Sequence, residues 1–419
     1  MPGRAPGSLS ARCCIAGGGP AGMMLGLLLA RAGVDVVVLE KHADFLRDFR
    51  GDTIHPSTLE LIHELGLLEQ FLALPHQKVR QLTAQVGEIR IPIADFGSLP
   101  TRCKFVAFIP QWDFLNFLAQ QAERYPAFQL RMSAEVTGLI EHDGRIVGVR
   151  ADTLDGPLEV RAGLVVGADG RASVVREQAG LDVKELGAPM DVLWFRLSHQ
   201  RDDPEGVMGR FDSGHIFVML DRAEHWQCGF VVAKGTIDEI RRRGLPAFRA
   251  EVARLAPFAA NRVDELADWE QVKLLTVRVD RLRRWYRPGL LCIGDAAHAM
   301  SPVGGVGINL AIQDAVAAAN ILADPLSTNR ITTDQLRRVQ RRRELPTRLI
   351  QWVQVLIQNR IISRVLAERG PLKPPLVVRL LARFPALRRI PARLIGIGIR
   401  PEHVRTPAVP TPADGEKAG

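Results

Sequence analysis

The stretch Cys14-Ile-Ala-Gly-Gly-Gly-Pro-Ala-Gly22 decides the fold of this chain. Gly17, Gly19 and Gly22 follow an apolar run and have the Gly-x-Gly-x-x-Gly spacing of dinucleotide-binding loops. In such a loop the first glycine makes a tight turn, the second lets the backbone approach a pyrophosphate, and the third packs helix on strand. The N-terminus of the helix that follows offers N–H groups to the phosphates. We therefore expect a strand, a phosphate-binding turn and a helix here.

The residues that follow complete a β-α-β unit. Residues 23–31 have a helical pattern, residues 34–39 are strand-like, and Glu40 comes directly after them. A carboxylate at the end of the second strand accepts hydrogen bonds from the adenosine ribose, which argues against a 2′-phosphate there. The unit therefore predicts a bound dinucleotide, FAD or NAD.

Composition describes a globular protein that is large enough for two domains. The 419 residues are 47% hydrophobic and 24% charged. The five cysteines are odd in number and have no CxxC spacing, so we expect reduced, buried thiols, no disulfide framework and no metal site. No run is expected to supply the roughly 18 apolar residues of a spanning helix, and the first ten residues lack a signal-peptide core. These patterns predict a cytoplasmic protein.

The excess of basic residues is confined to one C-terminal segment. Residues 330–405 hold 18 Lys and Arg against four Asp and Glu, although the whole chain has a net charge of only +9. Nucleic acid is therefore not an expected partner. Residues 351–358 and 375–384 are apolar, the second with Arg379 and Arg383 four residues apart. Two interpretations stay open: a surface peripheral to the inner membrane face, or helices that pack on the nucleotide domain with solvated arginines.

Strand and helix patterns alternate in a way that indicates an interleaved chain. Nucleotide-binding elements are expected in residues 11–75, 105–180 and 285–325. Strand-rich insertions at 76–104 and 181–284 are expected to form a substrate domain beside the cofactor. Residues 326–405 are expected to be helical, and residues 406–419 disordered.

Two further motifs lie at the ends of expected strands. Gly167-Ala-Asp-Gly-Arg171 places Asp169 and Arg171 before a helix, where a plain turn with a helix cap is the alternative. Gly294-Asp-Ala-Ala-His298 precedes Met300-Ser-Pro-Val-Gly-Gly-Val-Gly-Ile-Asn309 and another helix. Asp295 can bond sugar-like hydroxyls, and the glycine loop lets backbone approach a flat ring. The N-terminus of that last helix stabilises negative charge.

With these three motifs in order over residues 11–325, the chain resembles the class A flavoprotein monooxygenases, the para-hydroxybenzoate hydroxylase-like family. The resemblance implies an α/β fold: a Rossmann-like FAD-binding domain of the glutathione reductase type, an inserted, mainly antiparallel β-sheet substrate domain, and C-terminal helices. The family often has Gly-Gln-Gly where this chain has Gly305-Val306-Gly307. The resemblance implies that FAD is held by Gly17, Gly19, Pro20, Ala21, Gly22, Glu40, Lys41, Arg50, Gln111, Asp169, Arg171, Asp295, Gly305, Gly307, Ile308 and Asn309.

The implied reaction uses NAD(P)H and O2. By resemblance, NADPH or NADH reduces FAD, O2 adds at the flavin C4a atom, and the hydroperoxide hydroxylates or epoxidises an aromatic, quinone-like or isoprenoid molecule. No second glycine fingerprint is found, so the nicotinamide is expected to bind transiently. The first alternative is a reductase of the same fold that saturates an isoprenoid or other lipophilic substrate without oxygen. The second is a non-catalytic FAD-carrying scaffold.

Candidates for the substrate pocket come from the insertions. Trp194 and Phe195 must face opposite sides of a strand, so only one of them can line a pocket. A substrate-activating base could be His55, His215 or His298, but no residue is assigned a catalytic role because flavin does the chemistry. For each apolar candidate for the pocket wall, burial in the core is the favoured alternative, because large apolar residues are usually buried. These candidates are Trp194, Phe195, Phe217, Met219, Trp226 and Phe230.

Overall fold

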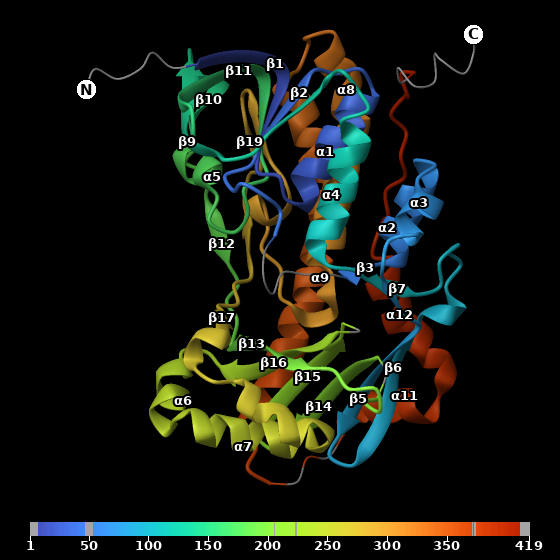
Figure 1. The fold of residues 1–419 in the computed structure, drawn as a ribbon. Helices are drawn as coiled ribbons and strands as arrows, with labels where there is room; N and C mark the ends of the chain where they lie inside the picture. The colour runs from blue at the N-terminus through green and yellow to red at the C-terminus, as the bar shows by residue number, and fades with distance from the viewer. Residues whose placement is uncertain are drawn as a thin grey trace.

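The computed structural model describes residues 7–46, 53–204, 206–222, 224–370, 372 and 374–410. Its largest sheet has a parallel core with strand order β20-β11-β1-β2-β8, and short β19 (Tyr286–Arg287) pairs antiparallel with β20 at one edge (Figure 1). The hairpin of β9 (Ala134–His142) and β10 (Arg145–Thr153) extends β11 antiparallel. The parallel strands are β1 (Gly7–Ala16), β2 (Val36–Leu39), β8 (Phe128–Arg131), β11 (Gly156–Gly167) and β20 (Leu290–Cys292).

Burial on both faces explains why the central strands are continuous apolar runs rather than alternating ones. All four residues of β2 are buried, as are the last four of β1. Helices α1 (Pro20–Arg31), α4 (Gln111–Ala122) and α8 (Gly307–Ser327) pack together beside this sheet (Figure 1). Two shorter helices, α2 (Pro56–Glu64) and α3 (Leu68–Leu72), follow β2 and β3 in the chain.

The second sheet joins the two insertions. Its order is β17-β13-β16-β15-β14-β5-β6, antiparallel except where β14 pairs parallel with β5. Two small ladders, β3-β7-β4 and β12-β18, lie where the chain passes between the large sheets. The strands of the second sheet are β5 (Gln81–Val86), β6 (Ile89–Asp95), β13 (Met190–Ser198), β14 (Val207–Asp212), β15 (His215–Asp221), β16 (His225–Ala233) and β17 (Lys273–Leu275). The ladder strands are β3 (Thr53–Ile54), β4 (Gln77–Val79), β7 (Val106–Phe108), β12 (Val183–Glu185) and β18 (Asp280–Leu282).

The second insertion is less strand-rich than the sequence suggests. Helices α6 (Ile237–Arg243) and α7 (Leu245–Leu255) and the 3₁₀ segment η2 (Pro257–Glu265) cover one face of the second sheet. Phe248, Val252 and Leu255 recur at helical spacing and are buried against Phe195 and its neighbours. The spacing of the apolar residues therefore changes within the insertion from a strand period to a helix period.

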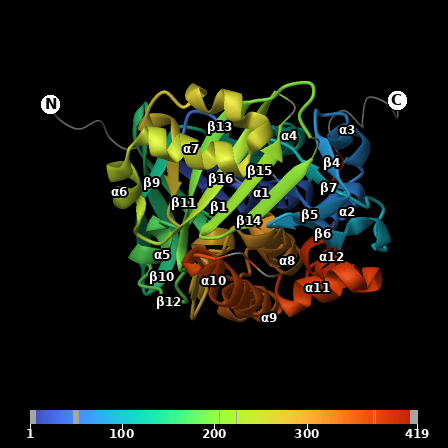
Figure 2. The ribbon, with the colours of Figure 1, turned by 90° about the horizontal axis from the view of Figure 1, so that it is seen from below.

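The C-terminal segment is a chain of helices. Helix α9 (Thr333–Ile357) starts at a capping box made by Thr332 and Gln335. The π-helical turn η6 (Gln358–Ile362), α10 (Ser363–Ala367), α11 (Leu376–Arg383) and α12 (Arg389–Gly396) follow it. Figure 2 shows α9, α10, α11 and α12 along one edge of the molecule.

Two expectations need correction: the absence of a long apolar helix and the start of the disordered tail. Residues 303–327 form a helical stretch that is long and apolar enough to span a membrane, but 78% of its most apolar window is buried inside the protein. It is therefore a core helix. The expected disordered tail starts too early: the backbone N–H of Val409 donates to the Arg31 carbonyl (2.8 Å), and the Arg31 guanidinium donates to the Thr406 carbonyl (2.9 Å). Residues 411–419 lie outside the described residues.

Candidate functional site

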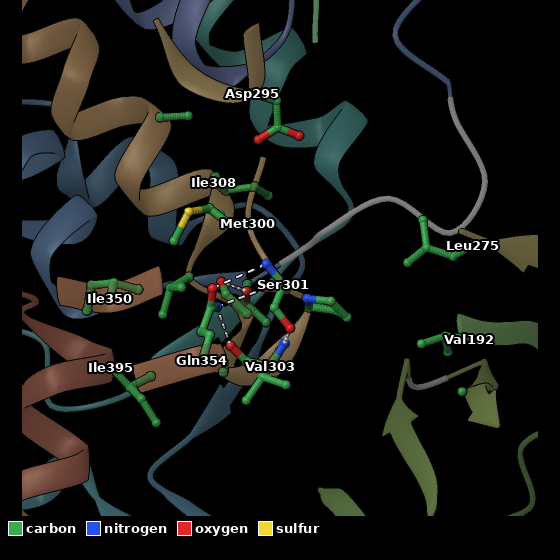
Figure 3. Close-up of a pocket in the computed structure, with 18 of the residues that line it drawn as sticks. Val192, Leu275, Asp295, Met300, Ser301, Val303, Ile308, Ile350, Gln354 and Ile395 are labelled. Carbon is green, nitrogen blue, oxygen red and sulfur yellow. Dashed lines mark hydrogen bonds between the residues drawn. The ribbon is translucent and has the colours of Figure 1, made fainter. Parts of the chain in front are cut away.

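A cavity of about 1190 Å³ runs between the two large sheets. It is lined by the three glycine-containing loops, by one face of the second sheet, and by residues of η6, α11 and α12. Figure 3 shows Met300, Ser301 and Val303 on one side of it and Val192 and Leu275 on the other. The cavity thus joins the expected cofactor loops to the expected substrate domain.

In the first glycine loop, Gly19 has open space where a Cβ atom would lie, whereas Gly17 and Gly22 do not. A Cβ atom at Gly17, whose φ is +103°, would lie 2.4 Å from the Ala168 carbonyl oxygen. A Cβ at Gly22 would lie 1.9 Å from the Gly17 carbonyl, so these two glycines pack backbone on backbone. At Gly19, the N-cap of α1, nothing lies within 4 Å of the Cβ position and no side chain caps the helix. The open N-terminus of α1 fits a pyrophosphate such as that of FAD.

Glu40 lies beside this loop at the end of β2. Its Oε2 accepts the Gly18 N–H at 2.9 Å, and its Oε1 accepts the His42 N–H at 3.1 Å. These bonds hold the carboxylate at the cavity wall, which Lys41 and Gln111 also line. Arg50, the arginine expected near the pyrophosphate, lies outside the described residues.

The second motif has a structural role as well as a place at the cavity. Asp169 accepts the Ser173 hydroxyl at 2.5 Å and the Val175 N–H at 3.1 Å, so it anchors the first turn of α5 (Val174–Gln178). Burial raises the pKa of Asp169, although these hydrogen bonds oppose the shift. Arg171 lies with its Nε atom 3.7 Å from Oδ2 of Asp295. The motif thus both caps a helix and brings Arg171 to the third motif.

The third loop presents backbone to the cavity. Gly304 and Gly305 have φ values of +81° and +61°, and the Thr53 hydroxyl donates to the Gly305 carbonyl at 3.0 Å. Gly307 and Ile308 begin α8, whose N-terminus has no side-chain cap. Its first N–H groups therefore have no partner within the helix.

Asn309 does not line the cavity with its side chain. Its Oδ1 accepts the His55 N–H (2.9 Å) and the Thr58 hydroxyl (2.7 Å), and its Nδ2 donates to the Thr53 carbonyl (3.1 Å). The side chain therefore ties α8 to residues 53–58. An expected flavin contact at this position can come only from its backbone.

Glutamines on α9 and at the first position of η6 support the third loop, and they were not predicted from the sequence. Gln354 donates to the carbonyls of Ser301 (3.0 Å) and Val303 (2.8 Å) and accepts the Ser301 N–H (3.2 Å), as Figure 3 shows. Gln358 donates to the Ser301 hydroxyl at 2.6 Å, and Gln351 donates to the Ala299 carbonyl at 3.2 Å. Their spacing of three, four and seven residues on one helix face is the signal that could have identified them.

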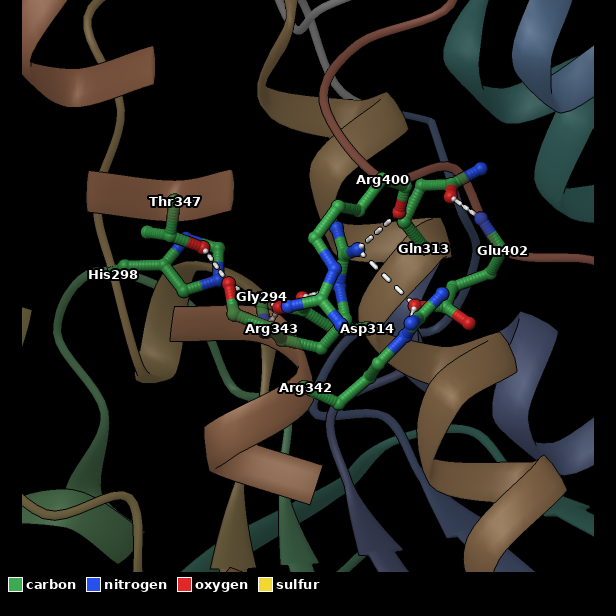
Figure 4. A network of polar contacts seen from close by, with 9 residues as sticks. All are labelled: Gly294, His298, Gln313, Asp314, Arg342, Arg343, Thr347, Arg400 and Glu402. Carbon is green, nitrogen blue, oxygen red and sulfur yellow. Dashed lines mark hydrogen bonds and ion pairs between the residues drawn. The ribbon is translucent and has the colours of Figure 1, made fainter. Parts of the chain in front are cut away.

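A second buried network joins the Asp295 loop to the C-terminal segment (Figure 4). Oδ2 of Asp314 accepts the Gly294 N–H at 3.1 Å and lies 2.6 Å from Nε2 of His298. Its Oδ1 accepts Nε of Arg343 at 3.0 Å, and Arg343 also contacts Glu402. Burial alone would raise the pKa of Asp314, but His298 and Arg343 outweigh it and lower that pKa.

Of the three histidines considered as bases, His55 alone lines the cavity. His298 contacts Asp314 through Nε2 and does not line the cavity. His215 also lies away from the cavity wall, with its Nε2 3.5 Å from Glu251. His55 is 1% exposed, and its Nδ1 lies 2.7 Å from the Ile395 carbonyl. Because a carbonyl can only accept, Nδ1 carries the proton and Nε2 is the acceptor of the neutral ring. Burial lowers the pKa of His55 to about 4, although the Ile395 bond opposes this.

Most of the large apolar candidates do not line the cavity. Trp194 lines it, whereas Phe195 packs on the other side of the sheet, as strand alternation requires. Trp226 is completely buried on that other side, where its Nε1 donates to Asp203 at 2.7 Å, so its expected place in the pocket is wrong. Phe217, Met219 and Phe230 are buried in the same core and do not line the cavity, which agrees with the alternative favoured for them.

Comparisons with known proteins agree with this arrangement. The family model described as a FAD binding domain matches residues 10–353. A 6-methylpretetramide 4-monooxygenase of Streptomyces rimosus is 33% identical over 382 residues, which cover 90% of this chain and 91% of that protein. The 3-demethoxyubiquinol 3-hydroxylase of Escherichia coli K12 is 26% identical over 75% of this chain and 80% of that protein. The crystal structure of p-nitrophenol 4-monooxygenase from Pseudomonas putida DLL-E4 shares the fold, with a TM-score of 0.78 over 93% of this chain and 97% of that chain at 19% identity.

Proposed function

Because this chain belongs to the FAD-binding-domain family and is an FAD-dependent monooxygenase, we propose that it hydroxylates a flat, largely apolar aromatic or quinone-like molecule inside the cavity. NAD(P)H and O2 are the co-substrates of this class. The two relatives are named as a monooxygenase and a hydroxylase, which favours this activity over the reductase alternative and over a non-catalytic scaffold. The observation that carries the proposal is the continuity of one cavity from the glycine loops to an apolar sheet face.

We propose that the parallel-sheet domain holds FAD, as a Rossmann-like domain does, and that the inserted second sheet forms the substrate domain. The open N-terminus of α1 would bind the pyrophosphate, and Glu40 the adenosine ribose. Asp295, with Arg171 beside it, would bind the ribityl chain. The same proposal covers the other cavity-lining residues expected at the cofactor: Gly17, Gly19, Pro20, Ala21, Lys41, Gln111, Asp169, Gly305, Gly307 and Ile308.

When bound, FAD supplies the activation of O2 by electrons from NAD(P)H. The chain's own contribution is electrostatic and steric. The N–H groups at the start of α8 would stabilise negative charge on a bound flavin. The apolar side chains that line the cavity would exclude water from the reaction.

The substrate class is inferred from the cavity wall and from the relatives. Val192, Trp194, Ile216, Val218 and Leu275 face the cavity and offer an apolar surface to a ring system. The relatives' names refer to a pretetramide and a demethoxyubiquinol, and we propose a substrate of this broad aromatic class here.

His55 would accept a hydrogen bond from a substrate hydroxyl through Nε2. A pKa of about 4 makes it a weak base toward a phenol, whose pKa is about 10. Its proposed role is therefore to orient the substrate rather than to remove a proton. The cytoplasmic location and a peripheral membrane contact through residues 330–405 also stay proposals.

The test measures NADH and NADPH oxidation by the purified protein with an oxygen electrode, against phenols, quinones and isoprenoids. We expect one compound to accelerate both NAD(P)H and O2 consumption and to gain one atom of ¹⁸O from ¹⁸O2. A product that gains only hydrogen, also under nitrogen, would replace this function by the reductase alternative.

A further inference from the structure

Exposed apolar side chains gather on the C-terminal helices. Of the fifteen large hydrophobic residues that are exposed in the described part of the chain, nine lie between residues 345 and 390. A contiguous exposed apolar surface on a globular protein marks a place where something binds. We call these nine residues the apolar patch: Leu345, Leu349, Trp352, Leu356, Leu376, Val377, Leu380, Phe384 and Ile390.

Helix α9 contributes a stripe to the patch. Leu345, Leu349, Trp352 and Leu356 recur every three or four residues and therefore share one face. The opposite face holds the glutamines that bond residues 280–303, so the stripe is not needed for packing. Trp352 is 64% exposed. An exposed tryptophan on such a stripe is typical of a membrane–water interface.

Helix α11 contributes the second part. None of its residues is buried, and Leu376 is 69% exposed. Apolar and basic residues lie on separate faces of α11, and neither α11 nor α12 contains an acidic residue. A short, strongly amphipathic basic helix of this kind is suited to the plane of a lipid interface.

Exposed arginines surround the patch. Arg360 and Arg364 follow the stripe of α9, and Arg379, Arg383 and Arg389 lie on α11 and α12. Within the described residues, no carboxylate lies within ion-pair distance of these five side chains, in contrast to Arg348, which pairs with Glu344. Their charge is therefore available to an anionic surface.

The patch also borders the mouth of the cavity. Ile357, Arg360 and Arg364 line the cavity from the α9 side, and Val377, Leu380 and Ile390 line it from α11 and α12. Several residues are thus both exposed on the patch and part of the cavity wall. A molecule buried beneath the patch could enter the cavity without crossing bulk water.

We propose that the apolar patch docks on an anionic lipid membrane and that the cavity opens toward that membrane to admit a lipophilic substrate. The choice of substrate class rests on the proposed monooxygenase function, whereas the docking does not. A second copy of the chain fits the patch less well, because a two-fold contact would place the arginine cluster against itself. An anionic membrane complements the same charge.

The experiment floats the full-length flavoprotein with vesicles of phosphatidylcholine alone or with 30% phosphatidylglycerol. We expect binding to the anionic vesicles and at least a tenfold loss of it in the Arg379→Glu/Arg383→Glu double variant. The matched control is Arg241→Glu/Arg242→Glu, which changes the charge equally at two exposed positions of α6 and should stay within twofold of wild type. Equal losses in both variants, or no flotation of wild type, would overturn the proposal.

Insertion of the patch has its own measurement. Brominated phosphatidylcholine in the anionic vesicles should quench tryptophan fluorescence of the wild type, and Trp352→Phe should remove the quenched component without loss of flotation. Quenching that persists unchanged in Trp352→Phe overturns the docking geometry. Light scattering without vesicles that reveals a dimer broken by Arg379→Glu/Arg383→Glu makes a second copy the occupant and also overturns it.

The membrane contact and the proposed function can be refuted separately. A protein that carries FAD and consumes O2 with a detergent-dispersed substrate but never floats with vesicles refutes the membrane contact alone. A protein that floats but neither carries FAD nor oxidises NAD(P)H refutes the proposed function alone.

Discussion

Arg343 of α9 and Asp314 of α8 form a buried ion pair in which Nε of the arginine lies 3.0 Å from Oδ1 of the aspartate. The other carboxylate oxygen accepts the N–H of Gly294, the residue before Asp295. Through this pair the C-terminal helices hold the loop that is proposed to bind the ribityl chain. The C-terminal segment is therefore part of the architecture of the site rather than an appendage to it.

Removal of Arg343 should destabilise the protein strongly. Arg343→Met leaves the buried carboxylate of Asp314 without its guanidinium partner, which costs about 3–5 kcal/mol. Urea unfolding of the FAD-bound protein measures the change. Arg342→Met is the control, since Arg342 is partly exposed and Glu402 keeps Arg343 as a partner. A similar loss in both variants would contradict the role of burial.

His55 should make stability depend on pH in the acid range. Its folded pKa of about 4 lies below the ordinary value of about 6.5, so the unfolded chain binds more protons between these values. The contribution of His55 to the unfolding free energy is therefore most favourable above about pH 6.5, and it is lost as the pH falls toward 4. It amounts to about 3 kcal/mol in total. His55→Gln should flatten the unfolding free energy over this window, and an unchanged slope would show that other groups cause it.

Gln354 should matter for flavin affinity. Gln354→Leu removes its hydrogen bonds to Ser301 and Val303 and leaves buried backbone groups unsatisfied, at about 1–3 kcal/mol. We expect the third loop to loosen and the dissociation constant of FAD, measured by fluorescence titration, to rise about tenfold. Gln120→Leu, at an exposed position of α4, is the control and should bind FAD as the wild type does.

Glu40 and Asp295 should each be needed to retain FAD. Glu40→Arg and Asp295→Ala remove the two carboxylates proposed to bind the sugar hydroxyls, so both proteins should purify colourless. The absorbance ratio at 450 and 280 nm measures this directly. Glu69→Arg, at an exposed position of α3, should remain yellow. Yellow protein from both test variants would refute the assignment.

Trp194 and Phe195 are neighbours that should respond differently. Trp194→Ala changes the cavity wall and should raise KM or uncouple NAD(P)H oxidation from product formation with little loss of stability. Phe195→Ala opens a hole in the core beneath α7 and should cost about 3–5 kcal/mol in unfolding free energy. Steady-state kinetics and urea unfolding of the pair together test which face of β13 meets the substrate.

Local patterns in the sequence were sufficient to predict the elements around the first glycine motif. Strand β1, helix α1 and Glu40 could be predicted because a phosphate-binding turn needs particular backbone space at fixed positions. Strand alternation likewise predicted that only one of Trp194 and Phe195 could line a pocket. It could not decide which one, because both faces of that sheet are apolar and only the position of α7 distinguishes them.

The sequence by itself determined the dinucleotide-binding β-α-β unit and the excess of charge in residues 330–405, since each depends on residues close together in the chain. The relatives then favoured a monooxygenase over the reductase that the sequence had left open. Only the tertiary structure decided that His55, and not His298, faces the cavity, that Trp226 lies outside it, and that α9 supports the Ser301 loop. These outcomes depend on contacts between residues that are far apart in sequence. No local period or propensity encodes such contacts, because they arise when the sheets and helices pack against each other.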